Sequence, residues 1–150
     1  MKATLATLAI LGVSSTAAFA DGHIAAGEKA FSQCQTCHVV VDDDGNTLAG
    51  RNAKTGPNLY GIVGRTAGTV EGFRYGDDLV AAGEKGLVWD EETFLAYVQN
   101  PSAFLKEYLE DNSARGRMSF RVRKEEDAAN LYAYLMSIGP EGEAVGEATN

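Results

Sequence analysis

The chain of 150 residues contains only two cysteines, two histidines and one tryptophan, and its 13 basic residues are outnumbered by 21 acidic ones. A net charge of -8 argues against nucleic acid as a partner, because phosphate groups require a basic protein surface. A structural zinc site is excluded too. Such a site takes four ligands, and the chain has neither a second cysteine pair nor two histidines close together in sequence. No apolar segment approaches the length of about 20 residues that a transmembrane helix needs, so stable membrane insertion is not expected.

The first twenty residues have the features of an export signal. Lys2 supplies a positive charge, an apolar stretch runs from Leu5 to Val13, and Ala18-Phe19-Ala20 has the small residues of a cleavage site. The alternative is an apolar first helix of the domain. We expect residues 1–20 to be a signal peptide cleaved after Ala20, which predicts a soluble protein in the periplasm. Losing Lys2 leaves 12 basic against 21 acidic residues, a net charge of -9.

Residues 21–139 are expected to form one all-α domain of short helices and long irregular segments, with an acidic flexible tail at 140–150. A helical face begins at Ile24 and ends at Cys34, with Gly27 and Phe31 between them. Residues 42–54 are polar and read as a surface loop. The glycine-rich stretch 55–76 has neither helical nor strand periodicity, which in a compact domain is typical of chain that wraps around something.

Three helices are predicted in the second half. Asp90 is a good N-cap for a helix ending near Gln99, and Asn100 can cap a second helix that starts at Pro101 and ends near Leu109. The last helix should cover about 124–138, followed by the Gly-Pro stop at 139–140. The pattern excludes a doubly wound sheet.

The sequence Cys34-Gln35-Thr36-Cys37-His38 matches the Cys-x-x-Cys-His signature of c-type haem attachment. Each thiol can form a thioether with a haem vinyl group, and the adjacent His38 is placed to bind the iron. A thioredoxin-like redox pair would need a neighbouring βαβ pattern, which is absent. A plain disulfide would leave His38 unexplained. The motif therefore predicts one covalent haem c, with iron bound by His38.

A carrier of single electrons needs a strong ligand on the second side of the iron. The candidates in the mature chain are His23, Met118 and Met136. His23 lies at the start of the helix that leads to Cys34, and Met136 falls inside the last helix, where packing is the commoner role of a methionine. Met118 lies in a polar loop about 80 residues after the motif. We expect Met118 to be the ligand, in the His/Met pairing that raises the reduction potential.

Several motifs together resemble the class I cytochromes c, most closely the large bacterial cytochromes c2 and c550. The resemblance extends from Gly27 to Leu135. In chain order the motifs are Cys34-Gln35-Thr36-Cys37-His38, Thr55-Gly56-Pro57-Asn58-Leu59-Tyr60-Gly61, Gly64-Arg65, Gly72-Phe73-Arg74-Tyr75, Trp89 and Met118-Ser119-Phe120. The resemblance implies a cytochrome c fold, with short helices and long loops around one covalent haem.

The resemblance also implies individual roles. The carbonyl of Pro57 would accept a hydrogen bond from His38. Arg65, Tyr75 and Trp89 would bind the buried haem propionate, and Tyr97 would hydrogen-bond the sulfur of Met118. A helix crossing is implied between the first and last helices, at Gly27, Phe31, Leu131 and Tyr134.

The chain departs from the family pattern at three places. Gln33 stands where lysine often precedes the first cysteine, and Gly116-Arg117 replaces the common Thr-Lys before the ligand methionine. Asp78-Leu79 occupies the position of a haem-side asparagine. These changes bear on the reduction potential and on the contacts of the propionate.

The implied function is electron transfer without catalysis, from a cytochrome bc1 complex to a photosynthetic reaction centre or a terminal oxidase. The alternative is a haem enzyme or gas-binding protein, which needs an open iron site and a distal acid or base. We expect the protein to be a monomer. Five cations flank Met118 and can form a docking surface for acidic partners, although a run of charged residues exposed to solvent is the simpler interpretation. They are Arg115, Arg117, Arg121, Arg123 and Lys124.

Overall fold

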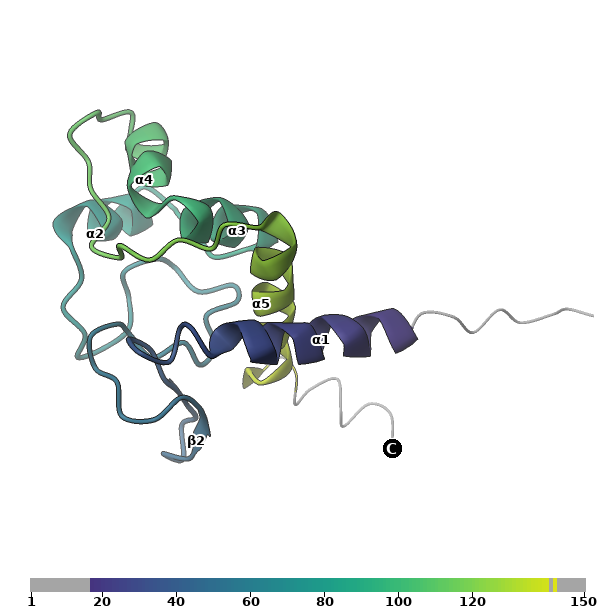
Figure 1. Cartoon of the computed structure of the whole chain (residues 1–150). Coiled ribbons are helices and arrows are strands. Elements are labelled where there is room, and N and C mark those ends of the chain that lie inside the picture. Colours follow the sequence, from purple (N-terminus) through teal and green to yellow (C-terminus); the bar gives the residue numbers. More distant parts are fainter. Residues whose placement is uncertain (1–16, 141, 143–150) are drawn as a thin grey trace, which may run out of the picture.

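The computed structural model describes residues 17–140 and residue 142 (Figure 1). Most of the predicted signal peptide and of the acidic tail lies outside these residues, so cleavage after Ala20 and the flexible tail stay predictions. The described part is built from helices with one small antiparallel sheet, which confirms the all-α fold class. The elements are α1 (Ala17–Phe31), β1 (Val40–Val41), β2 (Thr47–Ala49), α2 (Asp77–Glu84), α3 (Glu91–Gln99), α4 (Pro101–Leu109) and α5 (Glu125–Ser137).

Local capping signals determine where α3 and α4 begin. The Asp90 carboxylate accepts a hydrogen bond from the Thr93 N–H at 2.8 Å, and the Thr93 hydroxyl accepts one from the Asp90 N–H at 3.1 Å. This reciprocal pair is a capping box. Asn100 caps α4 through the Ala103 N–H, and Pro101 occupies the first turn. The predicted bounds of both helices are confirmed, and α5 lies within the predicted range 124–138.

Three elements were not expected from the sequence: the two strands and helix α2. The loop predicted at 42–54 contains β2, which pairs with β1 across a turn where the Asp42 carboxylate accepts a hydrogen bond from the Asn46 N–H at 2.7 Å. Strands of two and three residues are too short to show an alternating pattern. Helix α2 has Gly76 as its N-cap, with no side-chain capping bond, so its start is marked only by the acidic residues of its first turn, Asp77 and Asp78.

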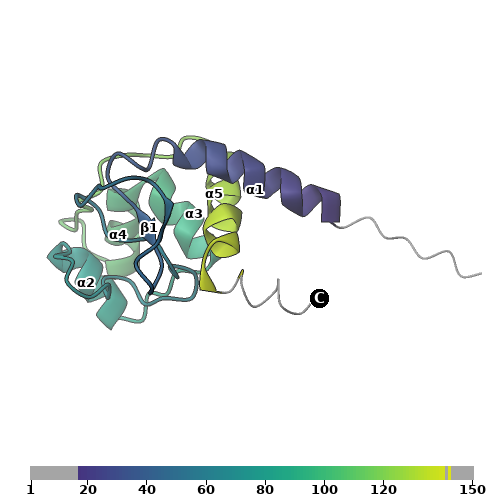
Figure 2. The same ribbon diagram turned by 90° about the horizontal axis from the view of Figure 1, so that it is seen from below.

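Helices α1 and α5 cross at a steep angle (Figures 1 and 2). Gly27 permits this contact, because a Cβ built there would lie 2.6 Å from the Tyr134 Cβ and would also overlap the Asn130 carbonyl. The Phe31 and Tyr134 rings lie 5.8 Å apart, and the His23 imidazole is hydrogen-bonded to the Asn130 amide oxygen at 2.6 Å. The implied contact between the first and last helices is therefore present in the structure.

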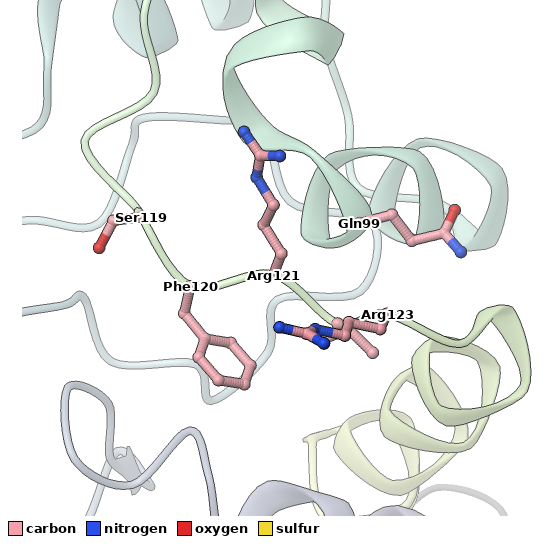
Figure 3. Close-up of a pocket in the computed structure, with 6 residues that line it drawn as sticks. Gln99, Ser119, Phe120, Arg121 and Arg123 are labelled. Carbon is pink, nitrogen blue, oxygen red and sulfur yellow. The ribbon is translucent and has the colours of Figure 1, made fainter.

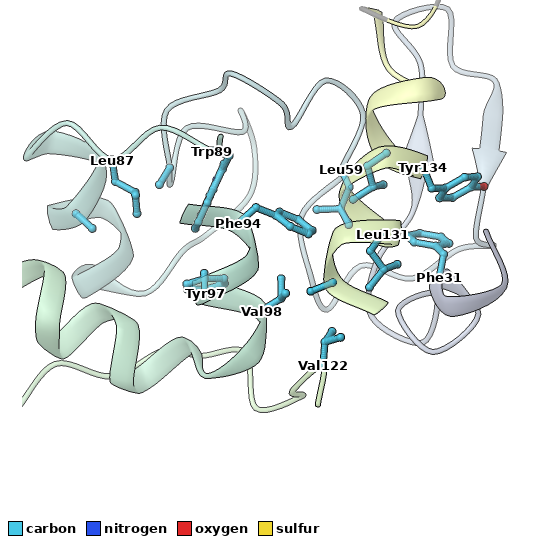
Figure 4. Close-up of a cluster of buried hydrophobic side chains, with 14 of the residues drawn as sticks. Phe31, Leu59, Leu87, Trp89, Phe94, Tyr97, Val98, Val122, Leu131 and Tyr134 are labelled. Carbon is cyan, nitrogen blue, oxygen red and sulfur yellow. The ribbon is translucent and has the colours of Figure 1, made fainter. Parts of the chain in front are cut away.

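The hydrophobic core extends from the crossing of α1 and α5 to α3. Figure 4 shows Phe94 between two groups of side chains, with Trp89 and Tyr97 on one side and Phe31 and Leu131 on the other. The glycine-rich chain 55–76 has no helix or strand and is tied to the segment before α3 by the bridge between Thr66 and Val88. Among the residues that the structure describes, no helix has the length and apolarity required to cross a bilayer.

Candidate haem-binding site

The two cysteines lie just beyond the end of α1. The helix ends at Phe31, and the chain continues through successive turns in which the Cys34 N–H bonds the Phe31 carbonyl at 2.8 Å and the His38 N–H bonds the Cys34 carbonyl at 2.9 Å. Both thiols are free, and both line one cavity of about 280 Å³. The turns thus bring Cys34, Cys37 and His38 to the same wall.

The imidazole of His38 is held in place by Pro57, which directly follows Gly56. Its Nδ1 lies 2.9 Å from the Pro57 carbonyl oxygen. A carbonyl can only accept a hydrogen bond, so Nδ1 carries the proton and the lone pair of the imidazole is on Nε2. Burial lowers the pKa of His38, which outweighs the opposing effect of the Pro57 carbonyl. The ring is therefore neutral at pH 7 and can ligate a metal through Nε2.

Gly56 is a site residue for which the sequence predicts no separate role. A Cβ built at Gly56 would lie 2.6 Å from Nδ1 and 2.8 Å from Nε2 of His38. The backbone of Gly56 thus packs flat against the imidazole. The sequence carries no signal of this contact, because glycine is frequent throughout the stretch 55–76.

Asn58 fixes the chain that carries the Pro57 carbonyl. Its side-chain amide donates to the Val41 carbonyl at 2.7 Å, and its amide oxygen accepts from the Val41 N–H at 3.0 Å and from the Tyr60 N–H at 3.1 Å. These bonds connect the 55–61 segment to β1. The acceptor of the His38 hydrogen bond therefore has a rigid support.

The environment of Cys34 is unsuited to thiolate chemistry. Burial, with a smaller contribution from Cys37, raises the pKa of the Cys34 thiol to about 11. A redox-active pair of the thioredoxin type depends on a lowered thiol pKa. The structure thus argues against that alternative and is compatible with cysteines that serve as attachment points.

Of the three candidate second ligands, only Met118 lines the cavity. Met118 is half-buried and packs against the core, in an irregular segment on the way to α5. His23 lies on α1 and bonds Asn130, while Met136 lies on α5 and is 42% exposed. The structure brings Met118 into one cavity with the Cys-x-x-Cys-His residues.

Three of the residues implied as propionate or sulfur partners form a further part of the lining. Tyr75, Trp89 and Tyr97 all border the cavity, and the Trp89 and Tyr97 rings are 4.9 Å apart. Burial raises the pKa of Tyr75, and burial together with Tyr75 raises the pKa of Tyr97 to about 12. The Tyr97 hydroxyl makes no hydrogen bond to another described residue, so its contact with the Met118 sulfur stays a prediction.

Arg65 also lines the cavity, and its guanidinium is oriented by backbone carbonyls. It donates to Gly61 at 3.0 Å, to Asn58 at 3.4 Å, and to Tyr60. Its backbone accepts from the Trp89 N–H at 3.0 Å, so two of the three implied propionate partners are adjacent. A binding role for Arg65 at a propionate stays a prediction.

The residues present fit a haem. Two thiols, one imidazole with a free Nε2 and one thioether face a largely apolar cavity, which suits a flat apolar ring that carries iron. No cluster of three or more His, Cys, Asp or Glu in the described part of the chain could hold a metal ion directly.

The five cations around Met118 are exposed in the structure. Arg115 and Arg117 border the cavity, whereas Arg121 and Arg123 line an open groove next to it, with Phe120 in the lining of both (Figure 3). Figure 3 shows the Phe120 ring and the Arg121 guanidinium on opposite sides of the chain. In the described residues the ion pair Lys85–Glu110 is the only one within 4.0 Å, so no carboxylate there neutralises these cations directly.

Sequence comparisons identify close relatives. The chain is 63% identical to cytochrome c2 of Rhodovulum adriaticum over 119 residues, which cover 79% of this chain and 94% of the relative. It is 50% identical to cytochrome c-551 of Roseobacter denitrificans over 138 residues, 92% of this chain and 96% of the relative. No protein-family model matches the chain.

The fold is similar to that of solved structures as well. The crystal structure of cytochrome c2 from Rhodobacter sphaeroides aligns with a TM-score of 0.76 and 62% identity, covering 77% of this chain and 95% of the other. Cytochrome c-550 from Paracoccus versutus aligns with a TM-score of 0.73 and 40% identity, covering 78% and 98%.

Proposed function

Because the chain belongs to the class I c-type cytochromes, we propose that it carries single electrons with His38 and Met118 as the two ligands of one haem iron. Membership of this family makes the chain an electron-transfer protein and not an enzyme, and implies a covalently bound haem c. The observation that carries the ligand assignment is the presence of Cys34, Cys37, His38 and Met118 around one cavity.

Haem c supplies an iron that gains or loses one electron without the making or breaking of a bond. Cys34 and Cys37 would hold it covalently, and His38 would bind it through Nε2 while the Pro57 carbonyl keeps the ring in position. Met118 would contribute a neutral thioether, which favours the ferrous state and raises the potential. Two strong protein ligands leave no position for a substrate.

Four further side chains of the cavity wall are proposed to contact the propionate or the ligand sulfur: Arg65, Tyr75, Trp89 and Tyr97. The Arg65 guanidinium and the Tyr75 hydroxyl would stabilise the charge of a buried propionate, with the Trp89 N–H as a further donor. Tyr97 would donate to the Met118 sulfur, for which its high pKa keeps the hydroxyl protonated. Each of these roles rests on the position of the side chain in the cavity wall.

We further propose that the protein works in the periplasm after cleavage behind Ala20 and docks membrane redox complexes through its five exposed cations. A cytochrome bc1 complex is the proposed donor, and a photosynthetic reaction centre or terminal oxidase the proposed acceptor. Cleavage would leave a net charge of -9, and the separation of the local cluster of cations from the acidic remainder would make the molecule a dipole. Such a dipole orients the cation face toward an acidic partner while permitting fast release.

Two measurements test this function. A potentiometric titration should follow a one-electron curve with a single midpoint, and two midpoints would contradict a single haem. The rate of oxidation by a membrane oxidase or reaction centre should fall as ionic strength rises. Arg123→Gln should lower the rate at low salt, whereas Arg51→Gln, an exposed cation near β2, should not. Rates that stay flat or rise with salt would contradict docking through the cations.

A further inference from the structure

The segment 115–117, which leads directly to Met118, has no regular secondary structure but is tied to two helices. The Arg115 N–H donates to the Asp78 carboxylate at 2.8 Å, and the Gly116 N–H donates to the Ser102 hydroxyl at 3.0 Å. Both acceptors are side chains, and they lie 37 and 14 residues away in sequence. The chain before the proposed ligand is therefore positioned by residues from outside the loop.

The two acceptors belong to helices that are connected with each other. Asp78 lies in the first turn of α2 and Ser102 in the first turn of α4, and these helices pack together. Lys85 at the end of α2 reinforces the connection, since its ammonium donates to the Tyr108 carbonyl at 3.1 Å and lies 3.7 Å from the Glu110 carboxylate. The pair α2–α4 thus provides a stable base for the segment.

Close packing restrains the same segment on two faces. A Cβ at Gly116 would lie 2.8 Å from the Pro101 Cβ, so the backbone is in contact with the start of α4. On the other face the Arg117 side chain covers Gly76, where a Cβ would lie 3.1 Å from the Arg117 Cγ. Movement of Met118 away from the cavity would have to disrupt these contacts and the two hydrogen bonds.

We propose that Asp78 is a positioning residue that keeps Met118 in the cavity, so that its bond to the Arg115 N–H limits how often the segment 115–118 opens. The proposal rests on Met118 being an iron ligand. Hydrogen bonds to a charged acceptor are stronger than those between neutral groups, which makes Asp78 the main anchor and Ser102 the secondary one. With haem bound, opening of this segment would give small external ligands access to the iron.

A purely structural role for Asp78 is the competing explanation. A carboxylate in the first turn stabilises a helix through the macrodipole, and α2 has two of them, Asp77 and Asp78. Asp77→Ala and Asp78→Ala remove the same charge from the same turn, but only Asp78 bonds the segment before Met118. Asp77→Ala is therefore the matched control, and Asp78→Asn retains an acceptor oxygen without the charge.

The first measurement is hydrogen exchange at the Arg115 amide in the ferric holoprotein, which reads the anchor directly and does not depend on the ligand of the iron. Asp78→Ala should accelerate this exchange roughly 3- to 10-fold, the loss expected for one exposed hydrogen bond. Asp77→Ala should leave it within about twofold of the wild type, and Asp78→Asn should give an intermediate or wild-type rate. Equal exchange rates of the Arg115 amide in Asp77→Ala and Asp78→Ala would overturn the role of Asp78 as an anchor.

The second measurement is the limiting rate at which imidazole binds the ferric iron at saturating concentration, when opening of the segment controls binding. The rate should rise roughly 3- to 10-fold in Asp78→Ala and not in Asp77→Ala. An unchanged limiting rate together with faster Arg115 exchange would overturn the control of opening by Asp78. A wild-type protein without the sulfur-to-iron absorption band would instead show that Met118 is not the ligand, which is a failure of the proposed function.

Discussion

The backbone of Gly56 lies directly against the imidazole of His38, with room for hydrogen but not for a methyl group. A Cβ at this position would be 2.6 Å from Nδ1, the atom that donates to the Pro57 carbonyl. Gly56 and Pro57 thus orient the imidazole ring of His38, and the Pro57 carbonyl sets its tautomer. The geometry of the proposed iron ligand depends on a residue that itself has no side chain.

We expect Gly56→Ala to displace His38 or the 55–57 chain. Overpacking of this kind costs about 1–3 kcal/mol, so the denaturation midpoint of the holoprotein should fall and its haem spectrum should change. Gly45→Ala is the control, since nothing lies within 4 Å of a Cβ there and only backbone strain at φ 86° is added. Gly45→Ala should leave the spectrum intact. Wild-type stability and spectrum in Gly56→Ala would contradict the contact.

Asn58→Ala should destabilise the protein by about 2–4 kcal/mol, because three hydrogen bonds are lost and the Val41 backbone groups lose their partner. The loosened Pro57 carbonyl should also shift the reduction potential. Asn46→Ala is a matched control, since its amide bonds only the exposed Asp42 carboxylate at 2.9 Å. Denaturant unfolding and a redox titration of both variants check this. Equal losses of stability in the two variants would disprove a special role of Asn58.

Gly27→Ala should separate α1 from α5, because the added methyl group overlaps the Asn130 carbonyl and the Tyr134 Cβ. The expected loss of unfolding free energy is about 2 kcal/mol or more. Ala26→Gly on the exposed side of α1 should cost only about 1 kcal/mol through helix propensity. A stabilised Gly27→Ala, as simple propensity would give, would show that the helices do not pack as described.

The N-cap of α3 should give stability that depends on pH. The Thr93 N–H and hydroxyl hold the pKa of Asp90 below its ordinary value of 3.8. A lowered native pKa means that the contribution is present above the unfolded pKa and is lost as the pH falls through the native one. Asp90→Ala should therefore cost about 1 kcal/mol at neutral pH and less at an acidic pH below the ordinary Asp value of 3.8. Urea unfolding at both pH values tests this, with Glu91→Ala as the control, whose cost should be smaller.

Local signals explain which elements the sequence could predict. Asp90, Asn100 and Pro101 act on neighbouring backbone groups, so the bounds of α3 and α4 were visible in the chain alone. Helix α2 depends on tertiary contacts instead: it has no side-chain cap, and Gly83 lies so close to the Ala67 carbonyl that a Cβ would overlap it. Its stability comes from packing, which no short-range pattern encodes.

The site, too, has residues that the sequence predicts and contacts that it does not. Cys34, Cys37 and His38 form a contiguous motif and could be predicted from chemistry, and Met118 followed from the short supply of alternative ligands. The contact of Gly56 with His38 and the bond from Arg115 to Asp78 join residues 18 and 37 positions apart. Such contacts are set by the path of the chain, which the residue types do not specify.

The absorption spectrum, with carbon monoxide as a probe, is the most direct test of iron ligation by His38 and Met118. This ligation predicts a sharp α-band in the reduced protein, the weak sulfur-to-iron band in the oxidised protein, and no reaction of the reduced protein with carbon monoxide. Met118→Ala should abolish the sulfur band and admit carbon monoxide, while Met136→Ala should change neither. A high-spin spectrum of the wild type, or its ready binding of carbon monoxide, would contradict His38/Met118 ligation and favour a haem enzyme or gas-binding protein.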